Sequence, residues 1–319
     1  MAKLPPDTCP TLVAADAALE ASQPVRRARR IGMGEIGGPC ERAIWYSFRW
    51  ATEQKFTAKT LKIFDGGHKS EALTASRIRL VAGIELWTID PDTGKQYAVT
   101  DPTGHMAGRI DGVVLGLLQA PKTPHVWDHK CSEKMSDLEK MITKVSEKRS
   151  LQAWSETYYG QAQCYMHYLQ LTRHWLTCSK PGDREWIAVR TEYDMTAAVR
   201  YEARAKRVVE AQEPPMRIAT KSDYYICKMC DHRSVCWNET IPKRHCRSCI
   251  HAMAVEGGQW ICGIGIETPL SIERQQLGCN AHLYLPGLID GRQIDADPDY
   301  KWIEYAFEDG SIWKDEGPV

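Results

Sequence analysis

The sequence predicts an α/β fold, in which one mixed central sheet is flanked by helices, followed by a small C-terminal metal-binding domain. Helical and strand-like patterns follow the order helix, antiparallel strands, helix, strand, which is typical of a sheet covered by helices. Twelve cysteines are present, and several fall in close Cys-x2-Cys spacings late in the chain. A chain of 319 residues is long enough for one large core and an appendage.

The composition indicates in which cellular compartment the protein is expected. The hydrophobic fraction is 43% and the mean hydropathy is −0.43. No apolar run approaches the roughly 20 residues that span a bilayer, and the first residues lack the apolar stretch of a signal peptide. We therefore expect a cytoplasmic protein without a membrane partner. In that reducing compartment the cysteines are expected to bind metal and not to form disulfides.

Charge is distributed unevenly along the chain, although the formal net charge is zero. From Asp290 to the end there are nine acidic and three basic side chains, a balance of −6, so the preceding residues carry +6. This balance fits a polyanionic partner, and it fits a solvated surface equally well. Residues 1–30 are expected to form a basic, flexible segment that either contacts DNA or stays solvated; its clustered arginines are Arg26, Arg27, Arg29 and Arg30.

A long helix is predicted over residues 59–81, because apolar side chains recur there at helical spacing. It carries His68 and Glu71, which are three residues apart and share one face. A lone histidine of this kind is more often structural than a ligand, so its interest depends on what the helix packs against. The other elements expected before the acidic strands are a helix over 43–48 and strands over 84–89 and 96–100, joined by the turn-rich residues 90–94.

The next two strands are expected to place two carboxylates and a lysine at one edge of the sheet. Asp111 precedes the β-rich run 113–115, and a second strand ends in Asp128, His129 and Lys130. Asp128 and Lys130 are two apart on a strand, so they share a face. Paired carboxylates suit hard cations such as Mg²⁺ or Mn²⁺, and a lysine can position water and support developing negative charge. Asp-x-Lys alone is a weak signal, since exposed strands often pair an acid with a base.

The second half of this region continues the α/β pattern. A helix over 136–149 would place Lys140, Lys144 and Lys148 in one stripe, which either follows a phosphate backbone or is a solvated face. The helix over 155–171 is rich in tyrosine and glutamine. The elements expected after it are strands over 174–179 and 185–191 and a helix that begins at Asp194 as N-cap and ends before Pro214 and Pro215.

Taken together, residues 31–240 resemble the RecB-like branch of the PD-(D/E)xK nuclease superfamily. Four motifs carry the resemblance: Gly67-His68 with Glu71, Gly108-Arg109-Ile110-Asp111-Gly112, Asp128-His129-Lys130, and Gln161-Ala162-Gln163-Cys164-Tyr165. The last is similar to the Gln-x-x-x-Tyr motif, whose glutamine and tyrosine help to hold DNA in the family. Ile110 stands where the family usually has proline, and either Gln161 or Gln163 could face the site.

The resemblance implies a role for each motif residue. Asp111 and Asp128 would ligate Mg²⁺ or Mn²⁺, with His68 as a further ligand and the His129 carbonyl as another candidate. Lys130 would orient the attacking water and Glu71 would assist. Gln161 and Tyr165 would position the DNA strand.

The cysteines form two sets. Cys227-x2-Cys230-x5-Cys236 follows the α/β region, and Cys40 lies far upstream. This layout resembles the iron–sulfur RecB-like nucleases, including CRISPR-associated exonucleases of the Cas-four type and their phage-encoded relatives. The resemblance implies a structural [4Fe–4S] cluster on these four thiolates, although a zinc ion would accept the same ligands.

The second set, Cys246, Cys249, Cys262 and Cys279, fits a tetrahedral Zn²⁺ site in a small β-rich domain over residues 241–289. His282, His245 or His251 could replace one of these cysteines. Such a domain either contacts nucleic acid or protein, or simply caps the fold. Residues 290–319 form an acidic tail whose aromatic side chains indicate a terminal strand pair.

The function expected from this reading is a divalent-metal-dependent DNA exonuclease acting on single-stranded ends in recombination, repair or CRISPR adaptation. Exonuclease action and single-strand preference come from the resemblance alone. The alternatives are a catalytically silent DNA-binding or adaptor protein on a nuclease fold, and an endonuclease subunit of a larger complex.

Overall fold

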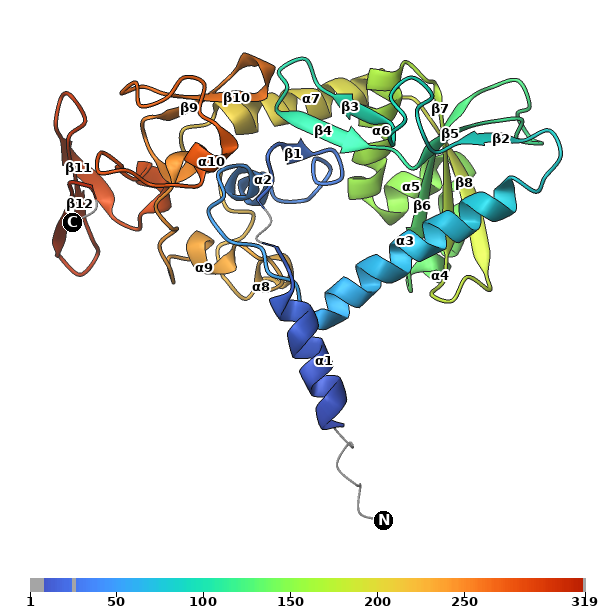
Figure 1. The fold of residues 1–319 in the computed structure, drawn as a ribbon, viewed down its shortest axis with the longest axis horizontal. Helices are drawn as coiled ribbons and strands as arrows, with labels where there is room; N and C mark the ends of the chain where they lie inside the picture. Colours follow the sequence, from blue (N-terminus) through green and yellow to red (C-terminus); the bar gives the residue numbers. More distant parts are fainter. Residues whose placement is uncertain (1–8, 25–26, 318–319) are drawn as a thin grey trace, which may run out of the picture.

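The computed structural model describes residues 9–24 and 27–317 of the chain. A five-stranded mixed sheet of order β2-β5-β6-β7-β8 forms one end of the molecule (Figure 1). Only the central β6–β7 pair is parallel, and the other neighbours in this sheet are antiparallel. The strands are β2 (Glu85–Trp87), β5 (Gly112–Leu115), β6 (His125–Cys131), β7 (Arg173–Ser179) and β8 (Trp186–Glu192).

Helices cover both faces of this sheet, which confirms the predicted α/β class. On one face, α3 (Ala58–Ile78) crosses β6 (Figure 1), and Trp127 of β6 packs with Ala75 and Ile78 of that helix. The opposite face packs on α6 (Glu156–Leu169), which contacts β6 and β7. Because successive strand residues point to opposite faces, neighbouring residues of β6 face different helices.

Three predicted helices begin at side-chain caps. Thr57, Ser155 and Asp194 each accept a hydrogen bond from the backbone N–H three residues ahead, at the starts of α3, α6 and α7. Such a cap satisfies an N–H that has no partner inside the helix. Other helices of this part of the chain are α2 (Glu41–Phe48), α7 (Met195–Glu210), α8 (Tyr225–Lys228) and α9 (Arg233–Cys236).

The prediction that Lys140, Lys144 and Lys148 form one stripe on a single helix is wrong. The chain forms α4 (Met135–Val145) and α5 (Glu147–Trp154), separated at Ser146, whose φ of 85° no continuing helix can contain. Lys148 therefore belongs to a different helix from Lys140, and it pairs with Glu192 of β8 at 2.6 Å.

The N-terminal segment contains a helix that the sequence analysis did not anticipate. Residues Pro10–Ala21 form α1, which packs against α3 and leaves Leu12 and Val13 exposed. Arg27 of the arginine cluster pairs with Glu53 at 3.1 Å, whereas Arg26 lies outside the described residues.

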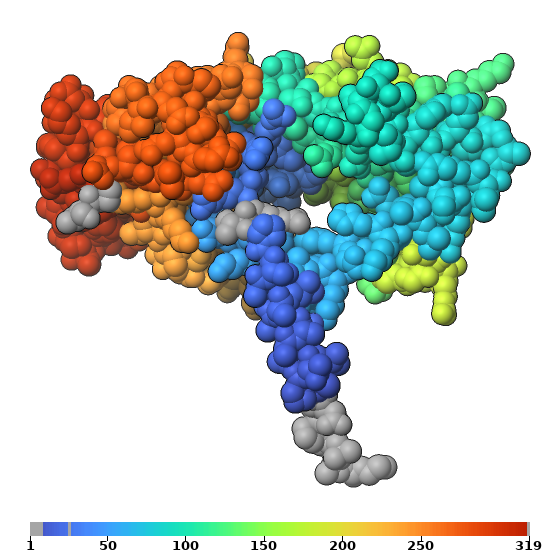
Figure 2. All heavy atoms as spheres, viewed as in Figure 1, coloured from blue at the N-terminus to red at the C-terminus, as the bar shows by residue number. Residues whose placement is uncertain are grey.

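A second sheet lies between the five-stranded sheet and the C-terminal module, where β1 (Ile31–Gly32), β4 (Met106–Arg109) and β3 (Ala98–Thr100) pair in the order β1-β4-β3 (Figure 1). Since β4 leads directly into Asp111, this sheet joins the start of the domain to the acidic edge. Figure 2 shows an open gap through the molecule between α3 and the region of β1 and α2.

The C-terminal residues form a C-terminal module of short elements beside the rest of the protein (Figures 1 and 2). The tail is a three-stranded antiparallel sheet, one strand more than the predicted pair. Asp315 of its last strand is buried and pairs with Arg244 at 2.8 Å, which fixes the tail to the module. The elements are η1 (Cys246–Ser248), β9 (Ala252–Val255), η2 (Glu256–Gly258), β10 (Gln259–Cys262), α10 (Ile272–Gln275), η3 (Pro286–Leu288), β11 (Arg292–Ala296), β12 (Ile303–Ala306) and β13 (Ile312–Asp315).

None of the helices in the described part of the chain combines the length and apolar character that a bilayer crossing needs.

Candidate active site

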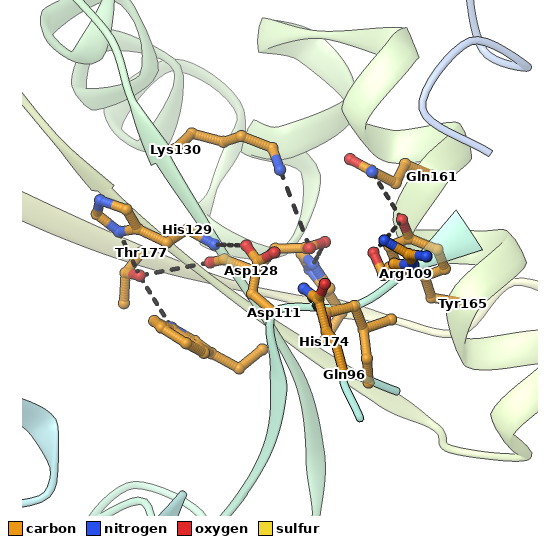
Figure 3. Close-up of polar contacts among 12 residues, drawn as sticks. Gln96, Arg109, Asp111, Asp128, His129, Lys130, Gln161, Tyr165, His174 and Thr177 are labelled. Carbon is orange, nitrogen blue, oxygen red and sulfur yellow. Dashed lines mark hydrogen bonds and ion pairs between the residues drawn. The ribbon is translucent and has the colours of Figure 1, made fainter. Parts of the chain in front are cut away.

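The acidic edge is created where two strands part. β5 pairs with β6 only as far as Gly112, which lies opposite Trp127. Beyond that point Asp111 takes the place of a strand partner, because its Oδ2 accepts the backbone N–H of His129 at 2.7 Å (Figure 3). The carboxylate of one strand is therefore attached to the backbone of the next, directly beside Asp128.

Asp128 and Lys130 point to the same face of β6, toward α6. The Lys130 Nζ lies 3.9 Å from the Asp128 Oδ1 (Figure 3), and it also lies over the ring of Tyr158 at 5.3 Å from the ring centroid. Asp128 is only 2% exposed, whereas the Lys130 side chain keeps 19% of its surface. The structure thus brings Asp111, Asp128 and Lys130 together at one edge.

The pKa values of the two carboxyl groups are shifted in opposite directions: that of Asp111 is raised and that of Asp128 is lowered. Burial, together with the charges of Asp128 and Glu71, raises the pKa of Asp111 to about 7 against the opposing effect of Lys130. Burial also acts to raise the pKa of Asp128, but Lys130 and His174 outweigh it and hold that pKa below its ordinary value. Burial acts to lower the pKa of Lys130, and Asp128 and Asp111 more than offset this, so the lysine stays charged. Such paired carboxylates favour a divalent cation between them.

The α3 residues lie at the margin of this edge. Burial raises the pKa of the half-buried Glu71, which is close enough to His68, Lys130 and Asp128 to respond to their charges. His68 is exposed. Within residues 9–24 and 27–317, no three His, Cys, Asp or Glu side chains converge closely enough to hold a metal ion as they stand. The predicted metal ligands therefore lie at one edge of the sheet, but they do not converge on a single metal position.

The His129 side chain lies on the other face of the sheet. Its Nε2 is hydrogen-bonded to Ser70 Oγ of α3 at 2.7 Å and its Nδ1 to Thr177 Oγ1 of β7 at 3.0 Å (Figure 3). Burial lowers its pKa to about 4, so the ring is neutral at ordinary pH. The imidazole thus fastens α3 to the sheet, and only the backbone of His129 adjoins the carboxylates.

His174 is a site residue that the sequence analysis did not identify. It lies on β7, and its Nε2 donates to the Asp128 Oδ2 at 2.9 Å (Figure 3). Both side chains are almost completely buried. The contact depends on the parallel register of β6 and β7, which pairs Asp128 with Leu176. That register cannot be predicted from a short-range pattern in the sequence.

The glutamine–tyrosine helix holds the strand that leads to Asp111. Gln161 Nε2 donates to the Tyr165 hydroxyl at 2.9 Å, and that hydroxyl donates to the Arg109 carbonyl at 2.7 Å (Figure 3). Gly108 makes this approach possible, because a Cβ there would lie 2.5 Å from the Tyr165 ring. Figure 3 shows Lys130 and Gln161 extending to the same side of the carboxylates.

The structure decides between the two glutamines of this helix. Gln163 is buried and faces the start of α7, where its Nε2 donates to the Glu192 carbonyl at 2.9 Å and its Oε1 accepts the Asp194 N–H at 2.8 Å. Its hydrogen-bonding groups therefore connect two elements of the scaffold. Gln161 is the glutamine beside the acidic edge.

Both cysteine sets gather around hollows. Cys40, Cys227, Cys230 and Cys236 line one hollow together with Tyr46 and His232, so the fold brings the distant Cys40 to the later three. Cys227 and Cys230 each lie within electrostatic range of Cys40 and Cys236. Four thiols around one hollow fit either a cluster or a zinc ion in ligand chemistry.

Cys246, Cys249, Cys262 and Cys279 line a second hollow in the C-terminal module, which His251 and His282 also border. Two of the three candidate histidines have both ring nitrogens in hydrogen bonds. His282 contacts Ser248 and Arg244, and His245 contacts Trp50 and the Ser248 N–H. Those bonds favour the four cysteines over either histidine.

Comparison with known proteins gives weak similarities only. No protein-family model and no curated protein matches the chain. Among solved structures, an alkaline exonuclease from Laribacter hongkongensis is 14% identical with a TM-score of 0.40, covering 57% of this chain and 87% of that one.

Two further solved structures are similar to this chain. The protein SSO0001 is 14% identical with a TM-score of 0.37, covering 72% of this chain and 96% of that one. A phage-related exonuclease from Haemophilus somnus 129PT is 12% identical with a TM-score of 0.32, covering 46% of this chain and 69% of that one. Similarity of this degree leaves the function to be argued from the residues themselves.

Proposed function

We propose that this protein is a divalent-metal-dependent deoxyribonuclease that hydrolyses phosphodiester bonds, and that it acts as an exonuclease on single-stranded DNA ends. The observation that carries the proposal is the meeting of Asp111, Asp128 and Lys130 at one strand edge, with both carboxylates held by hydrogen bonds. One carboxyl group has a raised pKa, the other has a lowered pKa, and a charged lysine lies beside them. This arrangement suits metal-assisted hydrolysis.

Asp111 and Asp128 would hold Mg²⁺ or Mn²⁺, with His68 and the His129 carbonyl as further ligands, and Glu71 would assist. When bound, the ion supplies a more acidic water and neutralises charge on the phosphate. Lys130 places its ammonium beside Asp128, where it can orient the attacking water and stabilise the developing oxyanion. His174 keeps the Asp128 carboxylate in one orientation.

The substrate is proposed to be one DNA strand. Arg109 is exposed next to the acidic edge, where it can contact a phosphate. The Gln161 amide is held beside the same edge by its hydrogen bond to the Tyr165 hydroxyl. Recombination, repair or CRISPR adaptation remain the processes that the sequence resemblance favours.

Cys40, Cys227, Cys230 and Cys236 are proposed to hold a [4Fe–4S] cluster. Its contribution would be structural, because it would join the chain near the start of the domain to the chain near its end. Bringing together such distant residues removes conformational entropy from the unfolded chain.

The test is cleavage of DNA labelled separately at each end, in Mg²⁺ and in Mn²⁺. We expect Asp128→Ala and Lys130→Ala each to abolish cleavage while DNA binding persists. Lys140→Ala is the matched control, because Lys140 pairs with Asp137 on the surface of α4, and it should cleave as the wild type does. Near wild-type cleavage by both site variants would refute the assignment.

Two other outcomes have distinct meanings. Tight DNA binding without cleavage by the wild-type protein in Mn²⁺ would identify a silent DNA-binding or adaptor protein. Internal cuts in a circular single strand would identify an endonuclease.

A further inference from the structure

Two arginines are buried where the C-terminal module meets the rest of the protein. Arg49, just after α2, and Arg247 of η1 are 0% and 1% exposed. Arg49 donates to the Ala252 and Ala211 carbonyls, both at 3.3 Å. All the hydrogen-bond acceptors that the described residues offer to the two guanidinium groups are carbonyl or amide oxygens, and none is a carboxylate.

The two guanidinium groups also lie close to each other. They approach the ring of Trp260 to 5.0 Å and 4.7 Å, and Arg247 lies 4.0 Å from the centroid of Trp50. Both groups remain charged at neutral pH. Cation–π contacts offset part of the cost of burying two like charges, but they supply no opposite charge.

The second cysteine set adjoins this pair of cations. Arg49 lies within electrostatic range of Cys249, and Trp260 shares β10 with Cys262. The hollow that the four cysteines line reaches Arg274, whose carbonyl lies 3.4 Å from the Cys246 Sγ. Four protonated thiols would leave the buried guanidinium groups without a counter-charge. Four thiolates around one Zn²⁺ carry a net charge of −2, which is opposite to the charge of the two buried arginines. Arg274, which lines the same hollow and lies within electrostatic range of Cys246, is a third cation near the site.

We infer that Cys246, Cys249, Cys262 and Cys279 bind one zinc ion as a tetrathiolate, and that Arg49 and Arg247 are the cations that balance its charge. The site is structural, because four thiolates leave no open position for a substrate. The zinc site would join the C-terminal module to the end of α2. This structural role is separate from the proposed nuclease chemistry.

Closing the site requires only local movement. The donor atoms do not converge to metal-binding distance as they stand, but each Cys Sγ moves by rotation about a single torsion that has three staggered positions. Three of the four cysteines lie in short segments between or at the ends of elements, namely η1, the turn after it and the residues after α10.

The experiment measures zinc and iron together in the full-length protein, purified without chelator from zinc-supplemented medium. We expect about one zinc per chain in the wild type, lost in Cys262→Ser and in Cys279→Ser. Cys9→Ser is the matched control, because Cys9 is an exposed thiol outside both sets, and it should keep its zinc. Co²⁺ added to metal-free wild-type protein should give the absorption bands of tetrahedral thiolate coordination.

The charge balance has its own measurement. Arg49→Gln should release zinc to a competing chelator about tenfold to 100-fold more readily, as loss of an outer-shell partner of a metal site does. Arg190→Gln is the control, because Arg190 is a partly buried arginine paired with Glu147 at 2.9 Å, away from the cysteines. Equal zinc affinity in Arg49→Gln and wild type would overturn the role of the arginines.

Three results would overturn the site itself. They are a wild-type protein without zinc, zinc that persists in Cys262→Ser, and zinc that is lost only when a cysteine of the first set is replaced. If the variants of the second set fail to fold, Cys40→Ser decides the question, because zinc that stays in this variant is held outside the first cysteine set, and zinc that is lost from it was not.

Discussion

Replacing Asp111 by asparagine should stabilise the metal-free protein above pH 7 while abolishing cleavage. The Asp111 carboxyl has a pKa of about 7, raised by burial and by the nearby carboxylates. Asparagine keeps an oxygen that can accept the His129 N–H, so the bond that holds the two strands together survives. The substitution therefore removes mainly the charge.

The sign of the pH dependence follows from the raised pKa. Between the ordinary value of 3.8 and about 7, the folded protein binds a proton at Asp111 that the unfolded chain has released. Wild-type stability therefore falls as pH rises through this window, and the penalty is complete above pH 7. A rise from 3.8 to about 7 corresponds to about 4 kcal/mol. Since Asp111 is only partly buried, we expect solvent screening to reduce this to about 2 kcal/mol.

The assay is urea unfolding in EDTA at pH 5 and pH 8, for wild type and Asp111→Asn. The difference between the two proteins should grow by about 1 kcal/mol from pH 5 to pH 8, because part of the effect is already present at pH 5. Mg²⁺ should stabilise the wild type at pH 8 and leave the variant nearly unchanged, because bound ligand stabilises only the protein that binds it. An equal stability difference at both pH values would refute the raised pKa and the crowding of carboxylates at this edge.

Three further predictions follow from single contacts. His174→Asn should weaken activation by Mn²⁺ about tenfold to 100-fold, because it removes the hydrogen bond that holds the Asp128 carboxylate. The Mn²⁺ dependence of cleavage measures this effect, and an unchanged dependence would show that His174 only packs against Asp128. Gly108→Ala should cost about 1–3 kcal/mol, because its Cβ would lie 2.5 Å from the Tyr165 ring; thermal unfolding measures the loss, and an unchanged Tm would contradict the close approach. Cys40→Ser should lose iron and sulfide but keep zinc in metal analysis of protein purified without oxygen, and retained iron would exclude this ligand set.

Much of the local structure was predictable because its causes are short-range. The cap residues Ser155 and Asp194 and the apolar spacing of α3 depend only on neighbours within a few residues. The shared face of Asp128 and Lys130 follows from the period of a strand. The break at Ser146 was not predictable, because the residues around it are compatible with a continuous helix.

The sequence by itself determined which chemical groups were available: two acids and a lysine on neighbouring strands, and two sets of four cysteines. Only the tertiary structure decided which of them meet. The parallel register of β6 and β7 brings His174 to Asp128, the parting of β5 from β6 leaves an N–H for Asp111 to bind, and the docking of the C-terminal module buries Arg49 beside Cys249. These contacts join residues far apart in the chain, and they depend on how whole elements pack, which no local pattern encodes.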